Sequence, residues 1–573
     1  MLVTTDTDGH RISPIGAALF AAALVLVAAS KGAQESAAGV PEPRPNIVVL
    51  MTDDQTVESL RVMTNVRRAL ATQGTTFPNS FASFPTCCPS RATFLTGQYA
   101  HNHLVMGNHP PLGGAQSLDH FNTLALWLQA AGYRTVHVGK YLNGYGKDET
   151  PFLPAGWSEW YASLDPSTYS FANYTLNENG TEVTYRGSAT SYQTDVYGRK
   201  GAELVRRLAP REEPFFLFVG FLAAHVGQPR DDDDPIAYST PSPAPRHQNA
   251  FATEPLPRPP SFNEADVSDK PLVLRRRARL TSPQVAEIQE LYQQRLESLL
   301  AADEAIARIV SALRTAGELA RTLIVFTSDN GFLHGEHRVP QGKVVVYEPS
   351  VRVPLILRGP GVARNRIQRD LVANVDLAAT IVDAADAFAA RLLDGRSLLP
   401  LAEDPDRRFG RDILLETSTY SAIRTPRYKY VEYRSGAREL YDLAHDPHEL
   451  RSLHRNRTFA SIGNELAQRL ARLRNCGGRT CSLAANVRLT LRGVGAESCV
   501  RSVAAVGVGG RDATKVARAE FRLAGRRLVV RRRAPFTAGV SRQRLTASGR
   551  LLRVALRFAD GRELTLDRQL RAC

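Results

Sequence analysis

Four short runs of the chain are rich in apolar residues, and polar or charged residues stand at or shortly after the end of each. They span residues 46–52, 133–140, 214–220 and 322–327. Runs of this length that are rich in β-branched residues are typical of strands buried on both faces, as in a parallel sheet. Amphipathic segments at 124–131 and 284–315 have helical spacing and lie between these runs. The alternation predicts an α/β fold in which helices flank a large mixed, mostly parallel sheet.

The polar residues at two of these strand ends are candidate metal ligands. Asp53 and Asp54 follow the first strand, and Asp329 and Asn330 follow the last. The carboxyl ends of parallel strands meet at one edge of a sheet, where α/β proteins bind their ligands, so these side chains should converge. Oxygen ligands of this kind suit Ca²⁺ or Mg²⁺ better than zinc. The alternative is a plain polar turn after each strand, since Asp-Asn-Gly is also a good turn sequence.

The first residues are typical of an export signal. Arg11 precedes an apolar run at 15–29 that is too short to span a bilayer comfortably, and small residues follow it. We therefore expect a signal peptide at 1–30 and a Pro-rich linker at 31–45, which makes the protein secreted or cell-surface. The acidic residues before the apolar run leave an uncleaved N-terminal anchor as the alternative.

The chain contains six cysteines, which is consistent with export. The expected disulfides are Cys476–Cys481 and Cys499–Cys573. This pairing would leave only Cys87 and Cys88 unpaired, near the start of the chain. Four cysteines allow three arrangements, so the connectivity stays open at this point.

The most specific motif is Cys87-Cys88-Pro89-Ser90-Arg91, which continues to Thr96-Gly97. Adjacent cysteines do not easily bond to each other, and neither has a Cys-x-x-Cys partner, so zinc and redox roles are poorly supported. The pattern C-x-P-S-R-x(4)-T-G resembles the signature of the formylglycine-dependent sulfatases, in the alkaline phosphatase-like superfamily. In that family the first Cys is oxidised to Cα-formylglycine, whose hydrate is the nucleophile. Only Cys87 has Pro two and Arg four positions downstream, so the resemblance marks Cys87 for conversion.

The resemblance also implies roles for the strand-end residues. One divalent cation, usually Ca²⁺, would be held by Asp53, Asp54, Asp329, Asn330 and an oxygen of the modified Cys87. Arg91 would keep the nucleophile and the cation site in register. Lys140 and Lys343 would contact the sulfate, although a loop lysine is normally just solvated. His225 would bind the ester and protonate the leaving oxygen, although a lone histidine after an apolar run is more often structural.

One position departs from the family pattern. Many members carry His two positions after the sulfate-contacting lysine, where this chain has Leu142, followed by Asn143. Asn143 is a candidate polar substrate contact in its place. The sequence Gly-Lys-Tyr-Leu-Asn and the Asn102-His103 pair resemble those of the N-acetylglucosamine-6-sulfatase and heparan endosulfatase branch. The resemblance covers about residues 45–474 and implies a smaller C-terminal antiparallel sheet within a catalytic domain at 46–475.

The resemblance implies a sulfuric ester hydrolase that removes sulfate from a sulfated carbohydrate or aryl sulfate. Its partners would include a formylglycine-generating enzyme, and no nucleic acid is expected. The closest alternative is a phosphonate or phosphate ester hydrolase of the same fold. A catalytically dead, secreted glycan-binding protein is a further alternative, and Leu142 is the one feature in its favour.

The last residues differ in character from the rest of the chain. The whole chain has a net charge of +15, and residues 482–573 hold 20 Lys and Arg against 6 Asp and Glu, a net charge of +14. Short alternating runs separated by Gly and Asp-Gly turns predict a basic, β-rich domain at 482–573, similar to a small β-sandwich. Such a tail could contact a polyanion, such as a sulfated glycan or an anionic cell wall. An arginine-rich solvated surface is the alternative.

Overall fold

A computed structural model of the chain describes residues 44–147, 151–187, 190–231, 234–482, 485, 487–495 and 498–573. The expected signal peptide and nearly all of the expected linker lie outside the described residues. The boundaries at 475 and 482 stay predictions. Among the described residues, no helix combines the length and apolar character needed to cross a membrane.

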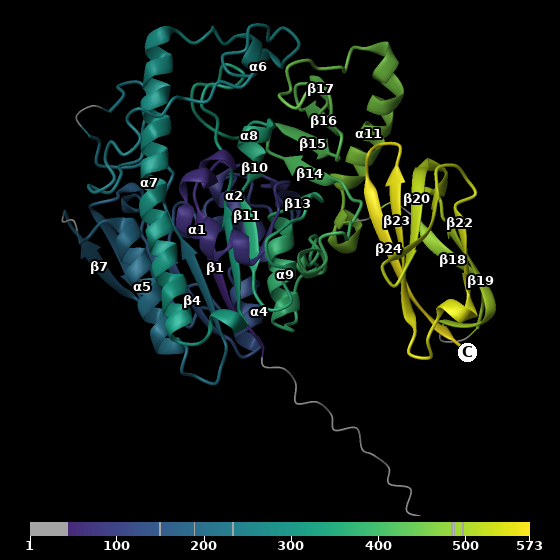
Figure 1. The fold of residues 1–573 in the computed structure, drawn as a ribbon. Coiled ribbons are helices and arrows are strands. Elements are labelled where there is room, and N and C mark those ends of the chain that lie inside the picture. Colours follow the sequence, from purple (N-terminus) through teal and green to yellow (C-terminus); the bar gives the residue numbers. More distant parts are fainter. Residues whose placement is uncertain are drawn as a thin grey trace, which may run out of the picture. The chain divides into compact units, whose positions relative to one another are not determined.

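The apolar runs form the centre of a ten-stranded sheet (Figure 1). In spatial order its parallel core is β9 (Thr322–Ser328), β1 (Asn46–Thr52), β8 (Phe215–Gly220), β4 (Arg134–Gly139) and β5 (Glu159–Ser163). Leu50 in β1 lies between Val219 of β8 and Phe326 of β9. The sheet is therefore mixed, as expected, with its parallel strands at the centre.

The outer strands are mainly antiparallel. On one side lie β12 (Arg366–Ile367), β2 (Thr75–Thr76) and β11 (Leu355–Arg358), and on the other β6 (Tyr174–Glu178) and β7 (Thr181–Tyr185). β6 and β7 form a hairpin within the Tyr-rich and Asn-rich segment that precedes helix α5. Antiparallel hairpins at the margin close a sheet without the long crossovers that parallel strands need.

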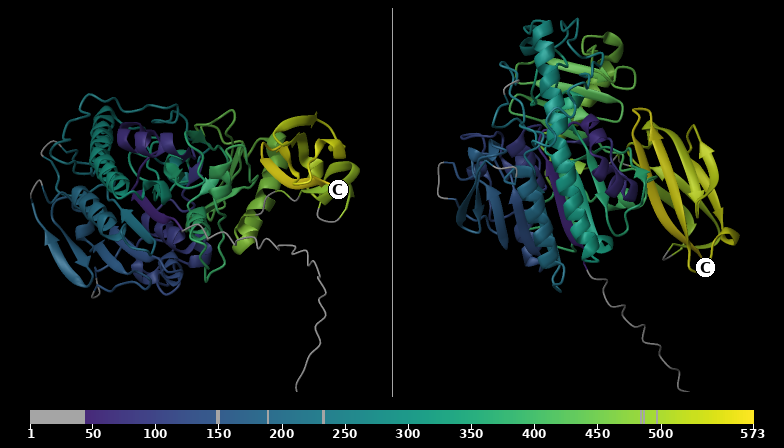
Figure 2. Two further views of the ribbon diagram at one scale, coloured as in Figure 1. Left: turned by 60° about the horizontal axis from the view of Figure 1, so that its bottom comes forward. Right: turned by 60° about the vertical axis from the view of Figure 1, so that its left-hand side comes forward.

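Helices cover both faces of the sheet (Figure 2). One face packs on α1 (Thr64–Ala69), α5 (Gln193–Leu208) and the long α7 (Ser282–Thr315), and the other on α2 (Cys87–Thr96), α4 (Leu124–Ala130) and α9 (Val375–Ala384). Successive residues of β1 alternate between the two cores: Val48 belongs to the first and Val49 to the second. This two-sided burial explains why β1 is apolar at nearly every position rather than at alternate positions.

Two smaller sheets follow the large one. β10 (Arg352–Val353), β3 (Ser80–Phe81) and β13 (Val372–Ala373) form a three-stranded sheet. β14 (Ile413–Glu416), β15 (Tyr420–Arg424), β16 (Tyr428–Tyr433) and β17 (Arg438–Asp442) form a four-stranded antiparallel sheet, against which α11 (Ala460–Leu473) packs. The expected smaller antiparallel sheet is confirmed, and its strands run from Ile413 to Asp442. The short helices are α3 (Ala100–His103), α6 (Leu272–Arg275), α8 (Glu348–Val351) and α10 (Leu399–Glu403).

The C-terminal residues form a seven-stranded sheet that curves around its own core (Figure 2). Its strands are β18 (Arg488–Val494), β19 (Cys499–Gly509), β20 (Val516–Leu523), β21 (Arg526–Arg531), β22 (Thr537–Ser541), β23 (Arg550–Phe558) and β24 (Glu563–Ala572). β24 pairs along most of its length with β23, and through Arg571 and Ala572 with β19. The two halves of the expected sandwich are therefore joined along one strand. Val506, Phe521 and Val554 are buried between them.

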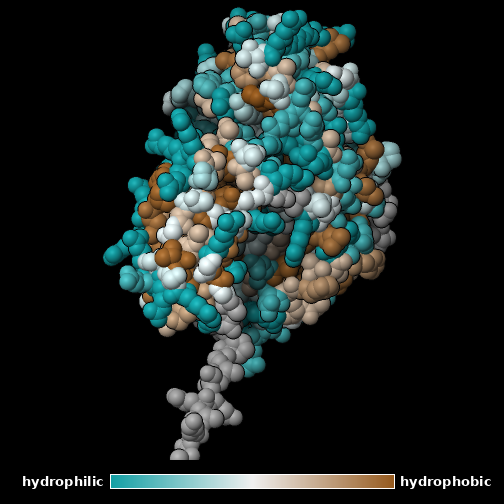
Figure 3. Space-filling model, turned by 90° about the vertical axis from the view of Figure 1, so that its right-hand side faces the viewer, coloured by the Kyte–Doolittle hydropathy of each residue, from teal (hydrophilic) through white to brown (hydrophobic). Residues whose placement is uncertain are grey.

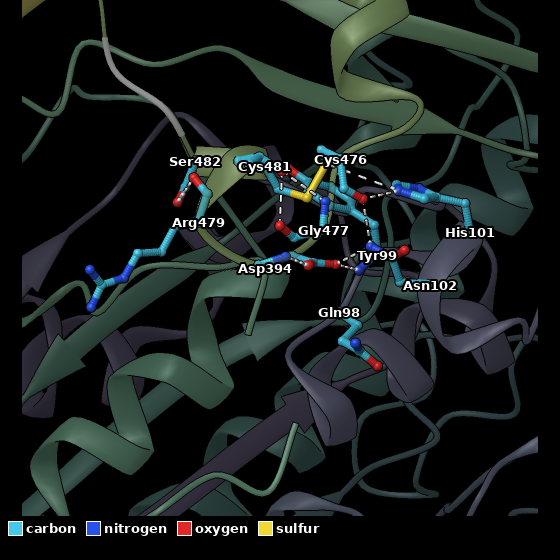
Figure 4. Close-up of a disulfide and its surroundings, with 12 residues drawn as sticks. Gln98, Tyr99, His101, Asn102, Asp394, Cys476, Gly477, Arg479, Cys481 and Ser482 are labelled. Carbon is cyan, nitrogen blue, oxygen red and sulfur yellow. Dashed lines mark hydrogen bonds between the residues drawn. A yellow bond between two sulfur atoms is a disulfide. The ribbon is translucent and has the colours of Figure 1, made fainter. Parts of the chain in front are cut away.

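Both expected disulfides are present, and Cys87 and Cys88 are free and buried. The loop closed by Cys476–Cys481 lies beside the segment that follows α2 (Figure 4). Asp394 accepts hydrogen bonds from the backbone N–H of Tyr99 at 2.8 Å and of Gly478 at 2.7 Å. The disulfide loop therefore holds the chain in place just beyond the signature helix.

Candidate active site

Four of the central strands deliver polar residues to one edge of the sheet. Asp53 follows β1, Asp329 follows β9 and Lys140 follows β4, and these strands run parallel through β8. The side-chain ligand atoms of Asp53, Asp54, Cys87 and His225 all lie within 4.8 Å of one another. Asp54 has a left-handed backbone conformation (φ 62°), which Asp tolerates better than most residues. The convergence predicted from the strand ends therefore occurs.

Cys87 is the first residue of α2 and is fully buried. Its Sγ lies 2.9 Å from Lys343 Nζ and 3.5 Å from Asp53 Oδ1. Burial, with the nearby Asp53 carboxylate, raises the pKa of the thiol to about 12. The unmodified side chain is therefore a protonated thiol at neutral pH and a poor nucleophile. The N-terminus of a helix nonetheless favours negative charge, so a different group at this position could hold a developing anion.

The rest of the signature explains how α2 is held. Arg91 lies one turn after Cys87 and is almost fully buried. Its guanidinium donates to Asp329 Oδ2 at 2.8 Å, to Asp53 Oδ2 at 3.0 Å and to the carbonyl of Lys140 at 2.8 Å. One side chain thus joins the ends of β1, β9 and β4. Gly97 ends the helix in a left-handed conformation (φ 65°), which accounts for the glycine of the motif.

Gly220, the last residue of β8, leaves space for this arrangement. A Cβ atom at Gly220 would stand 2.5 Å from the carbonyl oxygen of Lys140 and 3.1 Å from Arg91 Nη1. A larger residue would therefore displace the backbone that receives the Arg91 hydrogen bond.

The carboxylates and cations of the site are closely paired. Lys140 Nζ lies 2.5 Å from Asp53 Oδ2, and Lys343 Nζ contacts Asp54 Oδ1. Burial alone would raise the pKa of Asp53, but Lys140 and the other cations hold that pKa well below its usual value. Burial and the neighbouring Asp53 raise the pKa of Asp329 to about 6. The site is thus built from buried charges that stabilise one another.

His225 faces the same cluster. Its Nδ1 donates to the carbonyl of Val226 at 2.7 Å, which leaves Nε2 toward the site, 3.8 Å from Asp54 Oδ2. Burial lowers the pKa of His225 to about 4, and the attraction of Asp54 only partly opposes this. The imidazole is therefore neutral at pH 7 when no additional anion is bound.

The residues fit one divalent cation. The carboxylate oxygens of Asp53 and Asp54 lie together, and Asp329 stands beside them, its Oδ1 accepting a hydrogen bond from Asp54 N–H at 3.2 Å. Asn330 donates Nδ2 to Asp54 Oδ1 at 2.6 Å, whereas its Oδ1 is buried with no hydrogen-bond partner among the described residues. An unpartnered buried oxygen beside three carboxylates is the donor set that Ca²⁺ prefers.

Leu142 and Asn143 have different surroundings, although they are neighbours in the sequence. Leu142 is buried in a hydrophobic core and offers no polar group to the site. Asn143 is also buried and donates Nδ2 to the Tyr169 hydroxyl at 2.6 Å, while its Oδ1 has no partner among the described residues. Asn143 therefore reaches the other predicted residues through Tyr169.

The sequence interpretation missed Tyr169 and Arg295. The Tyr169 ring lies 4.8 Å from Lys140 Nζ and 5.1 Å from the His225 ring, so it forms a wall of the site. Arg295 donates to the carbonyls of Ala224, at 2.7 Å, and Asp54. A signal for Arg295 did exist, because it lies four residues from both Leu291 and Leu299 on the buried face of α7. Nothing in the sequence distinguished Tyr169 from the other tyrosines around it.

Comparisons with known proteins give one consistent result. A family model described as Sulfatase matches residues 45–387, and one described as N-sulphoglucosamine sulphohydrolase, C-terminal, matches residues 335–476. N-acetylglucosamine-6-sulfatase of Capra hircus is 31% identical over 493 residues, covering 76% of this chain and 85% of that protein. The extracellular sulfatase SULF-1 homolog of Drosophila melanogaster is 34% identical over 63% of this chain, but the match spans only 31% of that protein. A Caenorhabditis elegans relative, also 34% identical, is matched over about half of its length, 49%.

Solved structures share the fold. One, in complex with its substrate D-glucosamine-2-N,6-O-disulfate, superimposes with a TM-score of 0.63 at 24% identity, covering 75% of this chain and 97% of that chain. The phosphonate monoester hydrolase of Agrobacterium radiobacter has a TM-score of 0.56 at 22% identity, covering 78% of this chain and 98% of that chain. At these identities the likeness establishes the fold alone.

Proposed function

This chain belongs to the sulfatase family of sulfuric ester hydrolases, and we propose that it removes sulfate from a sulfated sugar through a formylglycine made from Cys87. The surroundings of Cys87 carry the proposal. Cys87 is the first residue of a buried helix, and its Sγ lies 2.9 Å from Lys343 Nζ and 3.5 Å from Asp53 Oδ1. An unmodified thiol with a pKa of about 12 would stay protonated at this position and would be a poor nucleophile. The hydrated aldehyde would supply a nucleophilic oxygen and a second hydroxyl that later expels sulfate.

The surrounding residues suit a sulfate ester. Lys140 and Lys343 bring positive charge to the sulfate oxygens, where negative charge concentrates as the S–O bond breaks. Asp53, Asp54, Asp329 and Asn330 would hold the cation, which supplies further charge neutralisation when bound. Arg91 keeps two of these carboxylates and the Lys140 backbone in one arrangement.

The orientation of the His225 ring supports a role as the proton donor to the leaving group. Because Nδ1 is committed to the Val226 carbonyl, Nε2 is the atom that can donate to the alcohol oxygen. The pKa of about 4 would keep the imidazole neutral, but a bound sulfate ester adds negative charge beside it and favours the protonated form. Proton transfer would then move the Nε2 proton to the departing alcohol.

The names of the relatives support a more specific substrate class. The goat relative is named N-acetylglucosamine-6-sulfatase, and the structure with a TM-score of 0.63 was solved with D-glucosamine-2-N,6-O-disulfate. We therefore infer a sulfated amino sugar as substrate and a dependence on a formylglycine-generating enzyme. The names of the extracellular sulfatase relatives also support export of this chain.

Peptide mass spectrometry across Cys87, on protein from its own host, tests the nucleophile. Sulfate release from an aryl sulfate and from 6-O-sulfated glucosamine, measured on the same preparation, tests the reaction. We expect an aldehyde at Cys87 and release of sulfate from both compounds. An unmodified thiol would contradict the mechanism and favour a glycan-binding role.

A phosphonate monoester belongs in the same assay, because the phosphonate monoester hydrolase of Agrobacterium radiobacter shares the fold. Hydrolysis of the phosphonate without sulfate release would replace the sulfatase proposal with the phosphonate alternative.

A further inference from the structure

The C-terminal sheet gathers arginines around an open pocket. Residues 516–537 contain seven arginines and a single acidic residue, Glu520. A pocket of about 550 Å³ is lined by Arg518, Arg527, Val530, Arg531, Arg532 and Arg533. Figure 3 shows one face of the molecule, and hydrophilic side chains cover much of it. This arginine pocket has no part in the catalytic machinery described above.

The pocket has much more positive than negative charge. Arg518, Arg522 and Arg527 share the one carboxylate of Glu520, at 2.7, 2.8 and 3.1 Å. Arg531 donates to the carbonyl of Thr537 at 3.1 Å. Arg532 and Arg533 are exposed, and within the described part of the chain they have no carboxylate partner. Several guanidinium groups in the pocket are therefore free to bind an external anion.

The register of two strands places these arginines together. Along β20, Ala519, Phe521 and Leu523 are buried in the core of the sheet. Side chains alternate along a strand, so Arg518, Glu520 and Arg522 point to the opposite, outer face. The core does not require the arginines, and grouping like charges costs free energy. Their concentration is thus better explained by a ligand than by folding.

We propose that the arginine pocket binds a sulfated glycan chain. A planar guanidinium can donate two parallel hydrogen bonds to an anionic group such as a sulfate, and several in one pocket match a polymer that carries repeated sulfates. None of the lining residues is aromatic, so the pocket lacks the stacking surface with which proteins hold single-stranded nucleic acid. The choice of a sulfated polymer rests on the proposed function. The anion-binding geometry does not.

The test compares two triple variants of the full chain. The first is R531S/R532S/R533S, in the arginine pocket. The matched control is R488S/R492S/R501S, which removes the same charge from exposed positions on β18 and β19 that do not line the pocket. Fluorescence anisotropy with labelled heparin oligosaccharide measures the Kd at several salt concentrations.

We expect the pocket variant to bind at least about ten-fold more weakly near physiological salt, with a salt slope reduced by about 2 to 3. The control should weaken binding by less than about three-fold. Equal losses in the two variants would overturn the proposal, because binding would then depend on overall charge. Equally tight binding of a DNA duplex or of desulfated glycan would overturn the assignment to sulfated glycans.

Two further measurements separate this inference from the proposed function. The pocket variant should hydrolyse a small aryl sulfate as fast as the unchanged protein, since the arginines do not belong to the catalytic site. The Cys87→Ala variant should bind heparin with unchanged Kd. If sulfate is never released but the pocket variant alone loses heparin, the proposed function fails and the arginine pocket stands. If sulfate is released and both triple variants lose heparin binding equally, the proposed function stands and the arginine pocket fails.

Discussion

The catalytic site and the arginine pocket are both rich in cations, but they hold their charge in different ways. In the proposed catalytic site Arg91, Lys140 and Lys343 are mostly buried, and each contacts Asp53 or Asp54. In the pocket three arginines share Glu520, and Arg532 and Arg533 are open to solvent.

The difference follows from solvation. A charge taken out of water must be paired, or the group neutralises or the fold is lost. Exposed arginines remain solvated and can stay unpaired. The buried set is therefore suited to one precisely placed sulfate ester, whereas the exposed set attracts a polyanion over a longer range. The following predictions test this contrast.

Replacing the nucleophile should have the largest effect. Cys87→Ala removes the side chain that we propose becomes the aldehyde, so sulfate release should fall by at least about 10³-fold. The adjacent Cys88→Ala is a matched control, because Cys88 is equally buried but is not among the clustered ligands. Sulfate release by the two variants gives the comparison. Comparable losses in both would mean that packing of α2, rather than chemistry at Cys87, limits activity.

Removing a buried cation should destabilise the fold. Arg91→Met leaves Asp53 and Asp329 without their shared guanidinium and should cost about 3–5 kcal/mol of unfolding free energy. Arg134→Met breaks an ion pair with Glu159 in which the arginine side chain is 30% exposed. This change should cost about 0–1 kcal/mol of unfolding free energy. Urea unfolding measures both. Similar costs would show that the buried network is not what stabilises the catalytic site.

A disulfide joins the first residue of β19 in the C-terminal sheet to Cys573, directly after β24. Cys499–Cys573 closes 74 residues, so C499S/C573S should lose about 4 kcal/mol. Cys476–Cys481 closes only 5 residues, and C476S/C481S should lose about 2 kcal/mol. Urea unfolding of each double variant, with the other disulfide intact, tests which disulfide contributes more to the free energy of unfolding. A larger loss at the short loop would show that its contacts beside Tyr99 and Asp394 matter more than chain entropy.

The smallest expected effect is that of salt on activity, and salt should act differently on the two cationic regions. Between about 50 and about 200 mM salt, kcat/KM for a small aryl sulfate should change by less than about three-fold, because buried charges are screened little. Over the same range heparin binding should weaken by about ten-fold or more. Parallel salt dependences would place both functions on one exposed surface.

Much of this could be predicted from the sequence. Asn46–Thr52 and Thr322–Ser328 are continuous apolar runs, and such runs become central strands wherever both faces are covered. The polar residues that follow them converge because parallel strands end at a common edge. Cys87 and Arg91 belong to one helical turn, so their relation is local and readable as a motif.

The sequence did not reveal Tyr169 or the arginine pocket, whereas Arg295 could have been found from its spacing along α7. Tyr169 is one of several tyrosines in its segment, and its importance comes only from its contacts with Lys140, Asn143 and His225. The total charge of the tail was countable, but whether it was spread or concentrated was not.

The sequence by itself determined the α/β core, the signature motif around Cys87 and the basic character of the tail, because those depend on composition and on neighbours along the chain. Only the tertiary structure decided which side chains face one another. The pairing of β20 with β21 puts Glu520 opposite Val530 and brings the arginines to one face. Contacts of this kind depend on strand register and packing, which no short stretch of sequence contains.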